Sequence, residues 1–200
     1  MFWLRTVAVL WLLGIVGGAV ILVRHQSTPG TAGPCPAQWP KEAQVARNPW
    51  QPTLLMFAHP QCPCTRASIG ELNRLLARCG NPPAAHVFFL EPAGADESWI
   101  ETDSYRSASS MPEVRVHIDR GGEQARLFGA GTSGHVVLYD LGGRLVFTGG
   151  ITAGRGHAGD NAGAESIVGF INNSSVRIAS TPVYGCGLFN SCKQEVLCAK

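Results

Sequence analysis

The sequence predicts an α/β domain with a central mixed β-sheet flanked by helices, preceded by one N-terminal transmembrane helix. Short apolar runs of strand length alternate with segments of helical periodicity through residues 45–175. Two late runs are joined by a tight turn, which adds an antiparallel hairpin to the otherwise parallel strands. A long uncharged run near the N-terminus predicts the membrane helix.

The N-terminal segment, residues 1–25, is expected to be an uncleaved membrane anchor. Val7 to Val23 is a run of 17 residues without a charge, and at about 1.5 Å per residue it spans roughly 25 Å. Phe2 and Trp3 can extend the span at the membrane interface. A cleaved signal peptide is the alternative, but Arg24 and its neighbours lack the small residues of a cleavage site.

The chain divides by composition into three parts after the anchor. Residues 26–44 are rich in Pro, Gly, Ser and Thr and predict a linker that holds the domain off the membrane. Residues 45–175 form the domain. Residues 176–200 form a C-terminal extension that carries three of the seven cysteines.

Each element of the domain has its own local signal. Residues 53–58 are a buried strand, and a helix with apolar residues at helical spacing follows from Thr65 to Cys79 and ends at Gly80. We expect Cys79, on the apolar face of that helix, to be buried. The later elements are a strand over 85–90, a helix over 96–107, a half-buried strand over 114–119, a short helix over 123–128, a hairpin over 135–148 and a helix over 160–172 capped by Asp160 or Asn161.

Charge and motif content exclude several classes of function. Arg5 and Arg24 account for the net charge of +2, since the remainder of the chain carries 14 basic and 14 acidic side chains. A nucleic-acid-binding domain needs a basic patch, so that class is excluded. The glycine-rich loop over 149–161 lacks the Lys-Ser/Thr of a phosphate-binding loop and is expected to be a turn, in which Arg155 and His157 could gate a substrate.

The strongest chemical signal is Cys62-Pro63-Cys64-Thr65, between a buried strand and a helix. A helix N-terminus carries unsatisfied N–H groups and partial positive charge, which stabilise a thiolate and lower its pKa. Arg66 adds a full positive charge nearby. Two thiols this close in sequence would form a strained disulfide, which suits exchange better than structure.

His59 lies three residues before Cys62. A partly protonated imidazole there could lower the pKa of the thiol or transfer a proton. A histidine on a surface loop is the simpler alternative.

Three stretches resemble the thioredoxin-like superfamily, and within it the membrane-anchored periplasmic thiol–disulfide oxidoreductases of the cytochrome c maturation type. Residues 57–66 (FAHPQCPCTR) are similar to the pattern F-W-A-T-W-C-G-P-C-R, and residues 116–128 and 136–149 resemble two further motifs of that family. The resemblance implies a thioredoxin-like fold, with Cys62 as the nucleophile and Cys64 as a candidate resolving thiol.

The sequence departs from that family at two positions. Thr65 stands where the family has its second cysteine, and Gly134 stands where it has a cis-proline that faces the site. The resemblance therefore places Ser133, Gly134 and His135 in the substrate-binding loop without that proline.

A second resemblance is to the copper proteins of cytochrome oxidase assembly (Sco type), which share the fold. Cys62, Cys64 and His135 could imitate their copper ligands, and thiolate with imidazole suits copper. The alternative function is therefore a copper metallochaperone; the oxidoreductase itself implies no cofactor.

The tail carries Cys186, Cys192 and Cys198 at intervals of six, without the paired C-x-x-C of a zinc ribbon. They predict one or two structural disulfides that could include Cys35, or else a third thiol that shuttles electrons to Cys62 and Cys64. Cysteines in the linker and the tail favour an oxidising compartment.

We therefore expect an inner-membrane protein with a single span and its domain on the periplasmic side. Its partners would be a thiol or disulfide protein substrate and a membrane redox donor or acceptor, with no nucleic acid.

Overall fold

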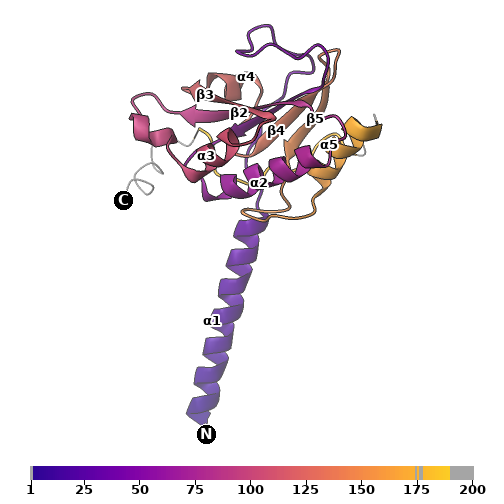
Figure 1. Cartoon of the computed structure of the whole chain (residues 1–200). Coiled ribbons are helices and arrows are strands. Elements are labelled where there is room, and N and C mark those ends of the chain that lie inside the picture. The colour runs from indigo at the N-terminus through magenta and orange to yellow at the C-terminus, as the bar shows by residue number, and fades with distance from the viewer. Residues whose placement is uncertain (1, 174, 176–177, 190–200) are drawn as a thin grey trace.

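A computed structural model describes residues 2–173, 175 and 178–189, and the chain is shown in Figure 1. Its sheet has five strands in the order β3-β2-β1-β4-β5. The strands are β1 (Thr53–Ala58), β2 (Ala84–Glu91), β3 (Val114–Arg120), β4 (His135–Tyr139) and β5 (Leu145–Gly150). The helices are α1 (Phe2–Ser27), α2 (Pro63–Ala77), the 3-10 helix η1 (Glu97–Ile100), α3 (Asp103–Ser109), α4 (Glu123–Leu127) and α5 (Ala162–Asn173).

The sheet is mixed, as the sequence predicts. β1 pairs with β2 in parallel, and β2 pairs with β3 in parallel. β4 runs antiparallel to β1 and forms a hairpin with β5. Helices link the parallel strands because a parallel crossover is too long for a tight turn. The domain has the thioredoxin-like fold.

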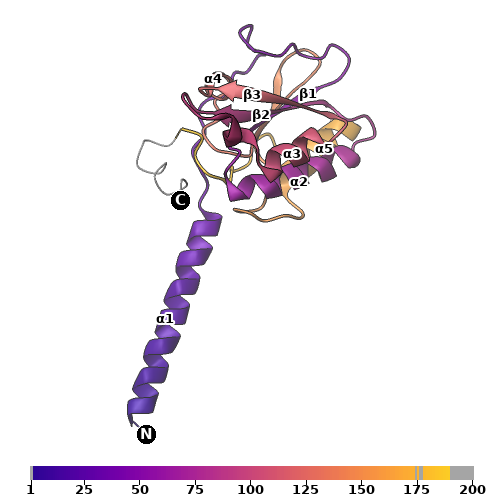
Figure 2. The same cartoon turned by 60° about the vertical axis from the view of Figure 1, so that its left-hand side comes forward.

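Two hydrophobic layers sandwich the sheet. On one face α2, α3 and α5 bury apolar residues such as Leu72, Ala108 and Ile167, and Cys79 lies in this layer as expected. Figure 2 shows α2 and α3 side by side on that face. On the other face α4 and the segment around Trp39 cover Phe57. The central strand β1 is therefore buried throughout.

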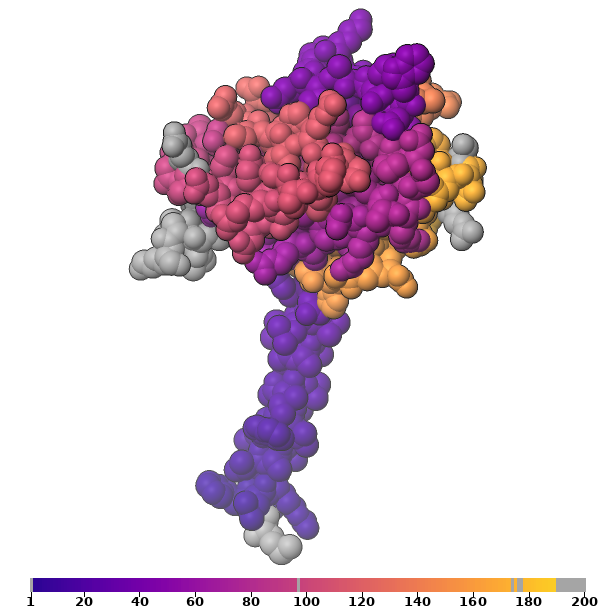
Figure 3. Space-filling view, in the orientation of Figure 1, coloured from indigo at the N-terminus to yellow at the C-terminus, as the bar shows by residue number. Residues whose placement is uncertain are grey.

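The α1 helix stands out of the domain as an exposed rod (Figure 3). It is 26 residues long, its apolar window has a mean hydropathy of 2.6, and none of its residues is buried in the domain. At about 1.5 Å per residue it is roughly 39 Å long, and a bilayer core is about 30 Å thick. It is long and apolar enough to cross a membrane.

The segment after α1 packs along the domain for part of its length. Gly33 N–H donates to the Gly129 carbonyl at 2.8 Å, and Trp39 N–H donates to the Gly143 carbonyl at 2.8 Å. The Tyr139 hydroxyl donates to the Pro36 carbonyl at 2.8 Å. These residues belong to the stretch that composition assigns to a linker, and their contacts give it a defined course over the sheet.

The prediction of one continuous helix over 96–107 is wrong. The structure has η1 and then α3, because the Thr102 side chain accepts a hydrogen bond from Tyr105 N–H and starts a new helix. The burial pattern along β3 also differs from the expected alternation of buried and exposed residues. The Asp119 carboxylate is 2% exposed, and its oxygens accept hydrogen bonds from Gln124 and Ala125 N–H at 2.9 Å. Asp119 thereby caps α4 from the neighbouring strand.

Candidate functional site

The site begins where β1 ends and α2 starts. Cys62 occupies the N-cap position of α2 with extended backbone angles, and Pro63 follows in the first turn. Proline suits this position because its fixed φ is already helical and its missing N–H would have no helical partner. Cys62 N–H donates to the His59 carbonyl at 3.1 Å, and Thr65 N–H donates to the Cys62 carbonyl at 3.0 Å. These bonds hold the Cys62 sulfur at the N-terminus of a 15-residue helix.

Three thiols meet at this point. The Sγ atoms of Cys62 and Cys186 are 2.7 Å apart, and the Cys64 thiol also hydrogen-bonds with Cys62. Cys62 is 3% exposed, while Cys64 and Cys186 are half-buried. The structure therefore places Cys62 and Cys64 together at a helix start, and Cys186 joins them from the C-terminal extension.

The pKa values of the three thiols are shifted in different directions. Hydrogen bonds to Cys186 and then to Cys64 lower the pKa of the Cys62 thiol against the opposing effect of burial. The same bonds raise the pKa of Cys186 and of Cys64, since each must keep its proton to donate it. The arrangement therefore favours one thiolate, on Cys62, with two protonated thiols beside it.

Ser133 fixes the loop that precedes Cys62. Its hydroxyl oxygen accepts a hydrogen bond from His59 N–H at 2.8 Å and lies 2.8 Å from Thr65 Oγ1. Thr65 Oγ1 donates its own proton to the His59 carbonyl at 2.9 Å, so the Ser133 hydroxyl donates to Thr65. The structure thus brings His59, Thr65 and Ser133 together, with Thr65 and Ser133 holding the loop in place.

The half-buried His59 imidazole contacts its own loop and the 3-10 helix η1. Its Nδ1 accepts a hydrogen bond from Gln61 N–H at 3.2 Å, and its ring packs edge-on against Trp99 with the centroids 5.5 Å apart.

Gly134 takes a conformation that proline cannot adopt. Its φ is +88°, and its N–H donates to the Phe57 carbonyl at 2.8 Å, whereas proline has φ near −65° and no N–H. No peptide bond is cis in the described part of the chain. At this position the loop is therefore built in a different way from the family that the sequence resembles.

Replacing Gly134 with alanine is expected to lower the free energy of unfolding by more than the same change at Gly94. Both residues have positive φ, +88° and +81°, which costs an alanine about 1–2 kcal/mol. A Cβ at Gly134 would also come within 2.6 Å of Ser68 Oγ, whereas at Gly94 it meets nothing within 4 Å. Urea unfolding of the two variants measures the difference, and an equal or smaller loss at Gly134 contradicts this account.

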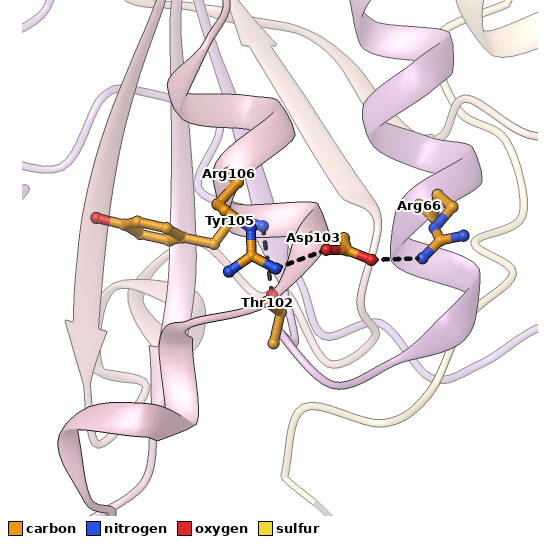
Figure 4. A network of polar contacts seen from close by, with 5 residues as sticks. All are labelled: Arg66, Thr102, Asp103, Tyr105 and Arg106. Atoms are coloured by element: carbon orange, nitrogen blue, oxygen red, sulfur yellow. Dashed lines mark hydrogen bonds and ion pairs between the residues drawn. The ribbon is translucent and has the colours of Figure 1, made fainter.

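The Arg66 guanidinium points toward Asp103 of α3 (Figure 4). Its Nη2 lies 3.0 Å from Asp103 Oδ2, and Asp103 also pairs with Arg106. These pairings, first that with Arg106 and then that with Arg66, lower the pKa of Asp103. The expectation that Arg66 supplies charge to the thiols therefore finds no support in its contacts.

Arg155 brings positive charge to two of the three thiols, Cys64 and Cys186. Its guanidinium donates to the Gly185 carbonyl, and its positive charge lowers the pKa of Cys64 and of Cys186, which offsets part of the larger upward effects. The arginine lies in the glycine-rich loop after β5. The loop itself behaves as a turn, and Asn161 caps α5 by accepting a hydrogen bond from Ala164 N–H at 2.8 Å.

His135 belongs to a different cluster from the three thiols. Its Nε2 lies 2.7 Å from Thr148 Oγ1 and 3.8 Å from Cys35 Sγ. Burial lowers the pKa of His135 to about 4, so the imidazole is neutral. Among the residues that the structure describes, no group of three or more His, Cys, Asp and Glu side chains could hold a metal ion. The structure does not bring Cys62, Cys64 and His135 together as copper ligands.

The other expected cysteine pairings have mixed outcomes. Cys35 and Cys186 are both free thiols in the structure, so no disulfide joins them. Cys192 and Cys198 lie outside the described residues. The interpretation of Cys186 as a third thiol beside Cys62 is the one that agrees with the geometry.

Comparison with known proteins supports the fold. No protein-family model matches the sequence, and no curated protein matches it either. An uncharacterized conserved protein from Geobacillus kaustophilus is similar in structure at 19% identity, with a TM-score of 0.57, over 84% of this chain and 94% of that chain. The hypothetical protein SMc02350 from Sinorhizobium meliloti 1021 is similar at 18% identity, with a TM-score of 0.58, over 84% and 98% of the two chains. At these identities the likeness concerns the fold alone.

Proposed function

We propose that the chain is a membrane-anchored thiol–disulfide oxidoreductase in which Cys62 is the nucleophile. One observation carries the proposal: the Cys62 sulfur lies at the N-terminus of α2 in contact with two other thiols. Both features favour the thiolate, which is the species that attacks disulfides. The resemblance to the cytochrome c maturation type supports the same class of reaction but rests on the sequence motifs alone.

The proposed reaction begins with attack of the Cys62 thiolate on a substrate disulfide. A new bond forms between Cys62 and one substrate sulfur, the substrate S–S bond breaks, and the other substrate sulfur leaves as a thiolate. A second thiol of the chain then attacks Cys62 and releases the substrate as a dithiol. Cys64 is the neighbour that the sequence assigns to this second step. Run in the opposite direction, the same exchange oxidises a substrate.

A redox partner at the membrane fits the position of the site. Arg155 N–H donates to the Gln26 carbonyl at the end of α1, at 3.1 Å, and the guanidinium of the same residue binds Gly185 beside Cys186. If α1 spans the bilayer, the three thiols lie close to the membrane surface. We therefore propose a membrane-bound donor or acceptor of electrons and a protein thiol or disulfide as substrate. We also propose that α1 lies in the inner membrane and that the domain is extracytoplasmic. The cysteines of the linker and of the C-terminal extension favour that oxidising compartment.

The test is reduction of insulin disulfides by the full chain in detergent micelles with dithiothreitol as the electron donor. The proposal expects catalysis that depends on Cys62. The same rate for the wild-type chain and for Cys62→Ser would overturn it.

A further inference from the structure

The C-terminal strap, which we define as residues 182–189, binds the loop before β4 as an added strand would. Ser133 N–H donates to the Cys186 carbonyl at 2.8 Å, and Leu188 N–H donates to the Gly131 carbonyl at 2.9 Å. Thr132 and Gly187 form an antiparallel bridge between these two bonds. The strap is therefore in a fixed register against the loop that also positions Cys62.

The strap fits closely at both ends of this contact. Val183 and Leu188 are 4% and 5% exposed, and Leu188 packs in the layer with Phe57. A Cβ at Gly185 would come within 2.1 Å of the Ser133 carbonyl oxygen, so only glycine fits there. These contacts on either side of Cys186 hold its sulfur 2.7 Å from Cys62 Sγ.

Cys64 is less well placed to form a disulfide with Cys62. It is the second residue of α2, directly after Pro63. Cys62 lies at the N-cap with extended backbone angles, and only Pro63 separates it from Cys64. A bond between these sulfurs would close a small ring and distort the first turn of α2, which holds the Cys62 thiolate. Cys186 comes from a separate segment, so its bond to Cys62 leaves that turn intact.

We propose that Cys186 is the resolving thiol, so that the redox-active disulfide joins Cys62 to Cys186 and the strap acts as an internal substrate. The proposal rests on the thiol–disulfide exchange proposed above and changes which thiol completes it. Cys64 then serves as a hydrogen-bond donor that holds the Cys62 thiolate.

The two steps balance within the chain and its substrate. In the first, the Cys62 thiolate bonds to one substrate sulfur and the second substrate sulfur leaves as a thiolate. In the second, Cys186 loses its proton to that thiolate and attacks Cys62 Sγ, which breaks the mixed disulfide and releases the first substrate sulfur. The substrate gains two electrons and the Cys62/Cys186 pair loses two. A dithiol donor restores the pair by the reverse exchange.

The strap also competes with a substrate for the site. The Ser133 N–H that binds the Cys186 carbonyl is the group that an extended substrate segment beside Cys62 would use. A substrate must displace the strap to reach Cys62, and the returning strap expels the product as it brings Cys186 back.

Trapping of the intermediate on the full chain in detergent distinguishes the two resolving thiols. The reduced protein receives one equivalent of oxidised glutathione, is quenched with acid and N-ethylmaleimide, and is analysed by intact mass and peptide mapping. The wild-type chain is expected to end with the Cys62–Cys186 disulfide and no bound glutathione. Cys186→Ser is expected to stop as the Cys62–glutathione mixed disulfide.

Two further variants keep the test independent of folding. Cys64→Ala is expected to take up glutathione more slowly, because Cys62 loses a donor, and still to end as the Cys62–Cys186 disulfide. Arg155→Gln keeps all three thiols but loses the contact with the Gly185 carbonyl, so glutathione release should slow relative to its uptake. Fragmentation of the peptide that spans residues 178–193 separates Cys186 from Cys192.

The outcomes separate this inference from the proposed function. A Cys62–Cys64 disulfide in the wild-type chain, or release of glutathione by Cys186→Ser at the wild-type rate, overturns the role of Cys186 and leaves the oxidoreductase standing. Failure of the wild-type chain to react with glutathione at Cys62 overturns the oxidoreductase itself.

Discussion

Replacing Cys62 with serine should remove disulfide reduction by the full chain and leave the uncatalysed background rate. The hydroxyl of serine has no thiolate to attack a disulfide and cannot form the mixed disulfide. Loss of a nucleophile from a group of cooperating side chains lowers the rate by about 10³-fold or more. Insulin reduction in detergent, with the rate followed as a function of protein concentration, measures this loss.

Cys79→Ala is the matched control for that experiment. Cys79 is a thiol 8% exposed in the layer beneath α2, and its Sγ contacts the Leu75 carbonyl and none of the three thiols of the site. Its loss should leave the reduction rate close to that of the wild-type chain. Equal losses in the two variants would show that the effect of Cys62→Ser is one of stability rather than chemistry.

Alkylation of Cys62 by iodoacetamide should stay fast at a pH where ordinary thiols no longer react. Only the thiolate reacts, and an ordinary cysteine has a pKa of about 8.5. Hydrogen bonds to Cys186 and Cys64 lower the pKa of Cys62, so its rate should fall only at a pH well below that value. Burial raises the pKa of Cys79, so this thiol should need a higher pH.

The same profile in Cys186→Ala tests the cause of the shift. The bond to Cys186 is the largest contribution that lowers the pKa of Cys62. Alanine has no donor to offer the sulfur, so the midpoint of the alkylation profile should move upward, toward the ordinary range. A midpoint that stays in place would show that the helix N-terminus and Cys64 are sufficient to stabilise the thiolate.

The strands and most helices can be predicted from local sequence patterns, because the spacing of apolar residues matches the residues that each element buries. The apolar run over 53–58 marks β1, which is buried along its whole length, and the spacing of Leu72 and Leu76 marks the inner face of α2. Asp119 shows where this logic ends. A carboxylate on a strand predicts exposure, but it is buried here because two backbone N–H groups of α4 satisfy it.

The candidate site divides in the same way. The position of Cys62 follows from a local pattern, a buried strand followed by Cys-Pro at a helix start. Cys186 lies 124 residues further along the chain. The residues next to it in the sequence do not predict which loop it contacts. The sequence resemblance predicts His135 beside Cys62, whereas its side chain lies toward Thr148 and Cys35. Contacts of this kind depend on tertiary packing, which a sequence pattern does not record.

A redox titration of the full chain tests most directly whether Cys62 belongs to a reversible thiol–disulfide couple. The protein is equilibrated in detergent with glutathione buffers of graded ratio, and the free thiols are counted at each point by alkylation and mass. The account predicts one two-electron transition in which two thiols disappear together, kept in Cys79→Ala and absent from Cys62→Ser. A transition that persists in Cys62→Ser, or no paired loss of thiols in the wild-type chain, would contradict it.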